Sequence, residues 1–152
     1  MRIALLVHIL SAVIWIGGMF FAYFALRPAS ARILEPAQRL ALWAATLERF
    51  FAWVWVTVAA LLVSGFYMLA MVAQMTAVPA YIFIMLYIAV AMMLIFAYVV
   101  IAPYARLKRA VAAQDWPAGG AALNQIRVLV AINLALGIIV IIDAIVGPMI
   151  GR

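Results

Sequence analysis

The sequence contains no cysteine, one histidine and four acidic residues, against ten lysines and arginines. The lack of cysteine excludes disulfides, thiolate metal sites and cysteine nucleophiles. Only two serines, Ser11 and Ser64, lie in apolar segments, and His8 is the single imidazole base available to them. No oxyanion-hole loop or phosphate-binding glycine loop is visible. A non-catalytic role is therefore expected more than an enzymatic one.

Charged residues are also scarce, and apolar residues fill their place. The chain is 73% hydrophobic and 9% charged, whereas a soluble domain is about 45–50% apolar and about 25% charged. No soluble fold buries this much apolar surface, so lipid must cover much of it. A helix crosses a bilayer with about 20 apolar residues, and four segments are long enough: 3–26, 50–73, 81–102 and 128–150.

These segments predict an all-α integral membrane protein, a four-transmembrane-helix bundle forming a single membrane domain over residues 1–152. Helices satisfy their own backbone hydrogen bonds in lipid, and none of the segments shows the alternation of a barrel strand. The first segment exceeds the roughly 7–15 residues of a signal-peptide core, so we interpret it as a retained span.

The positive charges predict an orientation. Eight of the ten basic residues fall in the long connections 27–49 and 103–127, while the short connection 74–80 carries none. The positive-inside rule places the long connections in the cytoplasm. The termini then face the periplasm of a bacterial inner membrane. Because the basic residues flank apolar spans, lipid is the expected partner and nucleic acid is not. Pro36 suits the first turn of a helix, which predicts a helical cytoplasmic extension.

Polar groups inside spans are costly and mark functional hypotheses. The candidates are His8, Ser11, Ser64, Asn133 and Asp143. By helical rise, His8 lies about 9 Å and Asp143 about 10 Å inside the outer ends of their spans. The thioethers of Met68 and Met85 fall at similar depth, with Tyr67 and Met71 flanking them. These residues predict an outward-facing layer that combines an imidazole, a carboxylate and several thioethers.

This ligand set suits a soft metal ion. Thioethers favour Cu(I), and imidazole binds copper generally. The predicted metal ligands are therefore His8, Met68, Met71 and Met85. Asp143, with Tyr67 and Ser11, would orient the imidazole or relay protons. The alternatives are that the methionines only fill gaps, and that His8 only hydrogen-bonds across helices.

Other residues predict helix packing. Trp15 and Gly18 share a helical face with His8 and Ser11. Small residues such as Gly17 and Gly18 let a second helix approach closely, and a homodimer is one possible consequence. Asn133 lies deeper and is expected to hydrogen-bond between helices.

Four segments of the chain form recognisable motifs. They are the run from His8 to Phe21 with its Trp15-Ile16-Gly17-Gly18 centre, Arg27-Pro28-Ala29, the LERFFAWVW segment at 47–55 and the AAQDWP turn at 112–117. Together they resemble the copper resistance protein D family of bacterial inner-membrane proteins. The resemblance implies a copper-handling role, commonly uptake or transfer across the inner membrane. Full-length members carry more spans than this chain.

A second resemblance is architectural. The four-span, haem-binding protoporphyrinogen oxidases also have a histidine followed by a tryptophan in the first span. This resemblance implies haem b with His8 as axial ligand. A single histidine excludes bis-histidine ligation within one chain, which leaves His–Met ligation or a haem shared across a dimer. The third alternative is a non-catalytic membrane subunit whose polar residues only lock helices together.

Overall fold

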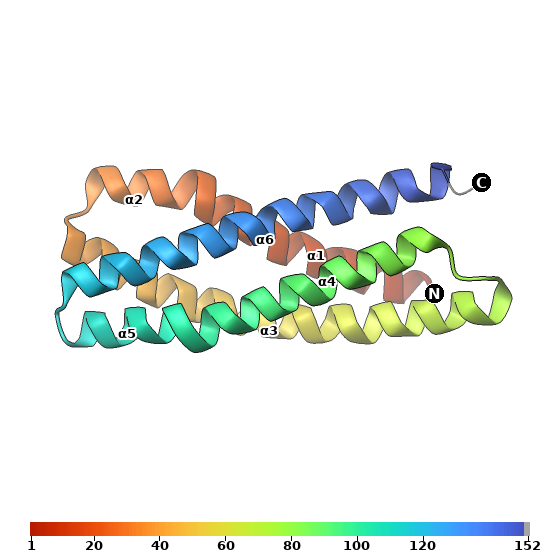
Figure 1. Ribbon diagram of the computed structural model, residues 1–152, viewed down its shortest axis with the longest axis horizontal. Coiled ribbons are helices and arrows are strands. Elements are labelled where there is room, and N and C mark those ends of the chain that lie inside the picture. Colours follow the sequence, from red (N-terminus) through yellow and green to blue (C-terminus); the bar gives the residue numbers. More distant parts are fainter. Residues whose placement is uncertain (151–152) are drawn as a thin grey trace.

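The computed structural model describes residues 1–150 and shows four long helical rods with no strand in that part of the chain (Figure 1). Each rod is long and apolar enough to cross a membrane, which confirms the predicted four-transmembrane-helix bundle. The elements are α1 (Arg2–Phe21), η1 (Ala22–Leu26), α2 (Arg27–Ile33), α3 (Pro36–Met75), α4 (Ala80–Val99), η2 (Val100–Tyr104), α5 (Ala105–Ala112) and α6 (Trp116–Ile150).

The rods are longer than a bilayer requires. Helix α3 has 40 residues, or about 60 Å of helix, whereas the hydrocarbon core is about 30 Å thick. The N-terminus and the α3–α4 connection lie at one end of the bundle, and the α2–α3 and α5–α6 connections lie at the other (Figure 1). The second end therefore carries the basic extensions, and the helix that begins at Pro36 confirms the predicted helical extension. Which end faces the cytoplasm stays a prediction.

Two short π-helices interrupt the rods close to prolines. The first, η1, lies just before Pro28, and the second, η2, contains Pro103. Proline has no backbone N–H and clashes with the carbonyl four residues earlier, so the wider π turn relieves the strain. In both rods the helix then continues into a basic segment, α2 or α5. Turns of this kind occur often at functional sites.

The core lies in the middle of the bundle and towards the basic end. Trp15 is 3% exposed, and its ring packs edge-on to Phe96 with centroids 6.0 Å apart. Phe51 packs in the same way against Phe96 and Tyr104, at 5.5 and 5.1 Å. Large apolar side chains elsewhere point outward, among them Ile3 at 78% exposed. An outer surface of this kind requires lipid contact.

Glycines lie at the closest contacts between helices. In the Gly17-Gly18 pair, only Gly18 lies at such a contact. A Cβ on Gly18 would collide with the Phe50 ring of α3, whereas one on Gly17 would meet no atom within 4 Å. Gly17 therefore meets no other described helix of the same chain, because the 100° step of an α-helix turns it towards the outside, and a role for Gly17 in a homodimer stays a prediction. Gly137 on α6 lies against Ile16 and Met92. Asn133 of α6 donates to the Met92 carbonyl of α4 at 3.3 Å.

One ion pair joins the basic extensions in the described part of the chain. Lys108 Nζ of α5 lies 2.8 Å from Glu48 Oε1 of α3, beyond the predicted apolar spans. The hydrogen bond and the charge of Lys108 lower the pKa of Glu48. Both side chains are largely exposed, so the pair contributes little to stability.

Candidate functional site

His8 and Ser64 form a polar contact between α1 and α3. Nδ1 of His8 lies 3.0 Å from Oγ of Ser64. Gly65 makes room for the ring, since a Cβ there would lie 3.2 Å from Cε1 of His8. The imidazole therefore rests directly against the backbone of α3, and its position is set by two neighbouring residues of that helix.

The hydrogen bonds of Ser64 determine which ring nitrogen carries the proton. The Ser64 hydroxyl donates to the carbonyl oxygen of Ala60 at 2.5 Å, so its single proton is already used. Oγ must then accept from His8, which puts the proton on Nδ1 in the neutral ring. In that tautomer Nε2 keeps its lone pair. A histidine whose one nitrogen is held by the protein has the other nitrogen available as an acceptor or as a ligand.

The predicted thioether ligands on α3 lie on the same face as Ser64. Met68 and Met71 follow Ser64 by four and seven residues, which places all three on one helical stripe. Both methionines are partly buried. They lie about 6 and about 10 Å further along the helix, towards the end that holds the α3–α4 connection. The stripe therefore continues from the imidazole towards that end.

Asp143 and Met85 lie on the other pair of helices, α6 and α4. A Cβ on Gly147 would lie 2.5 Å from Cβ of Tyr81, and one on Gly137 would lie 3.3 Å from Cε of Met92. These two contacts set an antiparallel register in which Asp143 is level with Met85. The Oδ2 atom of Asp143 is buried and has no hydrogen-bond partner among the described residues. A buried carboxylate oxygen without a donor requires a proton or a cation.

His8 and Asp143 lie at a similar level but are not joined. The contact of Gly137 with Ile16 sets the register of α6 against α1. Counting from that contact, Asp143 lies level with residue 10, about 3 Å along the axis from His8. No hydrogen bond or ion pair links His8 to Asp143 or to Tyr67 within the described residues. The imidazole is held by Ser64 and not by Asp143 or Tyr67.

Ser11 and Tyr67 differ in their surroundings. Ser11 is 6% exposed, one turn along α1 from His8 and on the same face. Tyr67 is 49% exposed and lies at the outer surface of α3. Only Ser11 therefore lies inside the bundle with the imidazole.

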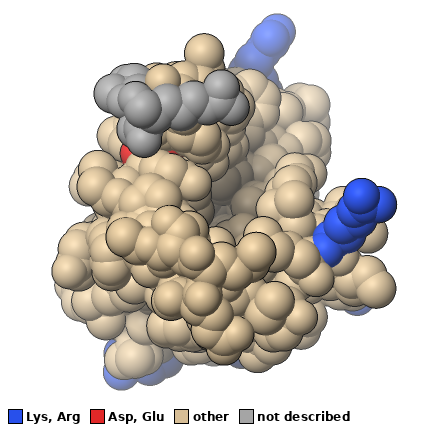
Figure 2. All heavy atoms as spheres, turned by 90° about the vertical axis from the view of Figure 1, so that its right-hand side faces the viewer, with Lys and Arg blue, Asp and Glu red and all other residues tan. Residues whose placement is uncertain are grey.

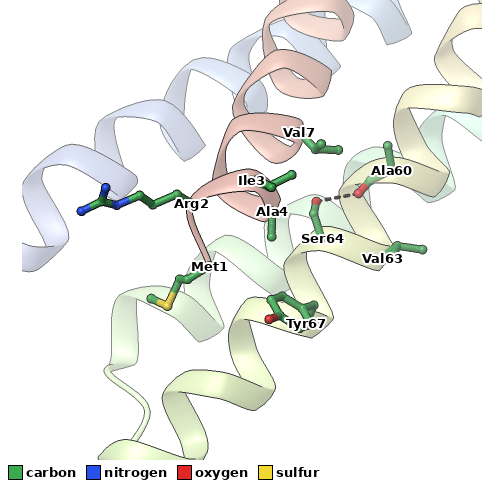
Figure 3. Close-up of a pocket in the computed structure, with 9 residues that line it drawn as sticks. All are labelled: Met1, Arg2, Ile3, Ala4, Val7, Ala60, Val63, Ser64 and Tyr67. Carbon is green, nitrogen blue, oxygen red and sulfur yellow. Dashed lines mark hydrogen bonds between the residues drawn. The ribbon is translucent and has the colours of Figure 1, made fainter.

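An open pocket leads to the contact between α1 and α3. It has a volume of about 660 Å³ and lies between the first turns of α1 and the part of α3 that carries Ala60, Ser64 and Tyr67 (Figure 3). Ser64 belongs both to its wall and to the hydrogen bond with His8. The Arg2 side chain points away from the pocket (Figure 3). Seen end-on, this end of the bundle is hollowed and its surface is mostly uncharged (Figure 2).

The donor set discriminates between metal ions. Within residues 1–150 there is no group of three His, Cys, Asp or Glu side chains that would hold a metal ion. Zinc prefers four such nitrogen, thiolate or oxygen ligands, and magnesium prefers six oxygens. The set that the sequence predicts, one imidazole with thioethers, is of the kind that Cu(I) prefers.

Ser64 is the residue that the sequence reasoning left out of the predicted site. The sequence identified it as a polar residue inside a span but gave it no partner. Its depth was a usable signal, since Ser64 lies about 14 Å inside the outer end of its span and His8 about 9 Å. The sequence did not show which face of α1 packs against which face of α3.

Comparison with known proteins gives one match. The model of a family described as copper resistance protein D matches residues 44–147. The matched region includes α4 and most of α3 and α6, and therefore Ser64, Met68, Met71, Met85 and Asp143, while His8 lies before it. No curated protein and no solved structure matches the chain.

Proposed function

Because the chain belongs to the copper resistance protein D family, we propose that it binds Cu(I) through Nε2 of His8 and the thioethers of Met68 and Met71. Met85 and Asp143, level with each other on α4 and α6, complete the polar layer. The family membership and the four apolar helices make the chain a copper-resistance membrane protein. The ligand set and the transfer of the ion are what we add.

The contact between His8 and Ser64 carries the proposal. A histidine that only joins two helices needs one ring nitrogen to hydrogen-bond the partner helix, and its second nitrogen has no further role. Here Ser64 accepts from Nδ1–H, and in that tautomer Nε2 carries the lone pair that a metal ion can bind. An imidazole prepared in this way binds a soft or borderline ion without first losing a proton.

The thioethers supply the selectivity. Because Met68 and Met71 lie on the same stripe as Ser64, an ion at Nε2 meets sulfur on the side of α3 towards the α3–α4 connection. Few ligands and no thiolate make for an affinity low enough to release the ion. Asp143 supplies a negative charge near the cation, which offsets part of the cost of a positive ion in an apolar bundle.

The pocket between α1 and α3 is the proposed entrance. It opens at the end of the bundle that the charge distribution places outside, and Ser64 lies in its wall. The ion would arrive from that side, pass the thioethers of the stripe and bind at His8. Transfer here means movement of Cu(I) between ligands, with no change in its oxidation state.

A Cu(I) titration of the purified protein tests the proposal. Under anaerobic conditions the protein competes with a chromogenic Cu(I) chelator, and we expect one ion per chain. His8→Ala should abolish this binding, and Met68→Leu should weaken it. Met75→Leu is the matched control, because Met75 lies on the same helix but is 77% exposed. Equal binding by the wild type and His8→Ala, both shown to be folded by circular dichroism, contradicts the proposal.

The same preparation separates copper from haem. After expression with ample haem, the copper site predicts a protein without a Soret band. A Soret band that disappears in His8→Ala would instead assign His8 to a haem. Zn²⁺ offered in place of Cu(I) should leave no bound metal after desalting, because the described residues lack a cluster of nitrogen and oxygen ligands.

A further inference from the structure

Three arginines differ from the other cationic side chains of the described chain. Arg27, Arg39 and Arg127 are partly buried, whereas every other described arginine or lysine is exposed: Arg2, Arg32, Arg49, Arg106, Lys108 and Arg109. Long cationic side chains normally extend into water. These three arginines do not, although they lie on three different helices.

The three arginines line one cavity. It has a volume of about 270 Å³ and lies between α2 with η1, α3 and α6, at the basic end of the bundle. Arg27 enters from α2, Arg39 from α3 and Arg127 from α6. No aspartate or glutamate lines the cavity, and the one ion pair within residues 1–150 lies elsewhere, between Lys108 and Glu48. The cavity therefore gathers three positive charges and supplies no negative charge.

Apart from Asn124, the remaining wall is apolar and aromatic. Leu40, Leu47, Ile126 and Val130 contribute to it. Tyr23 lies under the Arg27 guanidinium at 5.3 Å. The Trp43 ring also lines the cavity, while its N–H is already donated to Ser30 Oγ at 3.2 Å. The π-helix η1 supplies Tyr23 and Ala22, so the irregular turn of the first rod builds part of this wall.

The cavity lies at the level of the lipid headgroups. Arg27 directly follows the first predicted span, and Arg127 directly precedes the fourth. Both residues therefore lie where hydrocarbon gives way to headgroups. The apolar wall extends from there towards the spans, through residues such as Phe50 and Val130. An occupant with an anionic head and a hydrocarbon tail matches both parts of the cavity.

From this arrangement we infer that the cavity binds the phosphate group of an acidic phospholipid. Guanidinium groups present paired N–H donors that match phosphate oxygens. Basic pockets between transmembrane helices at the cytoplasmic side bind such headgroups. The lipid would join α2, α3 and α6, and its acyl chains would run along the outer surface of the bundle. The site is separate from the His8 layer and does not depend on copper binding.

Native mass spectrometry of the delipidated protein tests the inference. Phosphatidylglycerol, phosphatidylcholine and inorganic phosphate are added in separate arms, and bound molecules are counted per chain. We expect one phosphatidylglycerol to be retained, no phosphatidylcholine and no inorganic phosphate. Retention of phosphatidylcholine to the same degree would show that hydrophobic contact alone holds lipid. Binding of inorganic phosphate alone would show a site for a free anion. Either result overturns the inference.

Matched variants locate the lipid. The triple variant with Arg27→Gln, Arg39→Gln and Arg127→Gln should lose the retained phosphatidylglycerol, with about tenfold weaker binding for each arginine removed. The control triple variant with Arg32→Gln, Arg49→Gln and Arg109→Gln removes the same charge from exposed positions and should bind as the wild type does. If the first triple variant fails to fold, two single variants on α3 make the same comparison: Arg39→Gln inside the cavity and Arg49→Gln at an exposed position. If the cavity variant and its exposed control lose bound phosphatidylglycerol equally, the assignment of the lipid to the cavity is overturned.

Discussion

The hydroxyl of Ser64 on α3 holds the imidazole of His8 on α1 at 3.0 Å. Because that hydroxyl also donates to the Ala60 carbonyl, the contact selects the tautomer with the proton on Nδ1. A serine at this place therefore does more than bridge two helices. In that tautomer the lone pair is on Nε2, the atom through which we propose that His8 binds Cu(I).

Replacing Ser64 by alanine should weaken Cu(I) binding without abolishing it. The imidazole loses the acceptor that fixes its orientation, and loss of such a partner costs about 10–100-fold in metal affinity. The chelator competition titration measures the change. Thr57→Ala is the control, since the Thr57 hydroxyl also bonds a backbone carbonyl of α3, that of Val54, at 2.9 Å. An affinity change in Thr57→Ala as large as in Ser64→Ala would show that the effect is not specific to His8.

Asp143→Asn should separate stability from metal binding. The amide keeps the size of the carboxyl group and removes a charge whose burial costs about 2.5–3.5 kcal/mol on insertion scales. The thermal unfolding midpoint should stay the same or rise, while Cu(I) affinity should fall because the counter-charge is gone. Asp115→Asn, at the start of α6 and outside the spans, is the control for affinity. Unchanged Cu(I) affinity in Asp143→Asn would remove this residue from the site.

Gly147→Ala should destabilise the outer half of the bundle. The new Cβ would lie 2.5 Å from Cβ and 2.7 Å from Cγ of Tyr81, and these atoms cannot move without the backbone of α4. Overpacking of this kind costs about 1–3 kcal/mol. Gly17→Ala meets open space and should be neutral or slightly stabilising, since alanine is the better helix former by about 1 kcal/mol. Reversible unfolding in mixed micelles measures both, and equal midpoints would contradict the packing of α4 against α6.

The ion pair between Glu48 and Lys108 predicts a weak pH dependence. Lys108 lowers the pKa of Glu48 in the folded protein. A lowered carboxyl pKa stabilises the fold above the unfolded-state value, and this stabilisation is lost as the pH falls through the folded-state value. The unfolding midpoints of the wild type and Glu48→Gln should therefore converge as the pH falls below that value. Glu35→Gln, at another exposed acid, is the control, and a difference that grows towards acid would contradict the account.

The fold was predictable from composition because lipid imposes it. Long apolar segments have to be helices, and their lengths define four of them. Proline at position 36 also located the start of α3. The site was less predictable. The depth of a residue in the bundle follows from counting residues along its helix, but which side of the helix packs against a neighbour does not. His8 and Asp143 share a level, yet the partner of His8 is Ser64.

Gly17 illustrates the same limit at a single position. Two adjacent glycines looked equivalent in the sequence, but a 100° rotation separates Gly18 at a helix contact from Gly17 in open space. The arginine cavity depends on the same kind of information. Arg27 and Arg32 both lie on α2, and only the packing of α2 against α3 and α6 distinguishes the partly buried one.

The most direct test of the proposed site is X-ray absorption at the copper K-edge of the Cu(I)-loaded protein, compared with Met68→Leu; His8→Ala, which should not bind Cu(I) at the site, is the control for adventitious copper. The account predicts an imidazole nitrogen and thioether sulfur in the first coordination shell of the wild type. It further predicts weaker sulfur scattering in Met68→Leu, where Met71 remains as a thioether ligand, and no imidazole multiple-scattering signal from any adventitious copper carried by His8→Ala. Copper surrounded only by oxygen, or a spectrum that is the same in all three proteins, would contradict it.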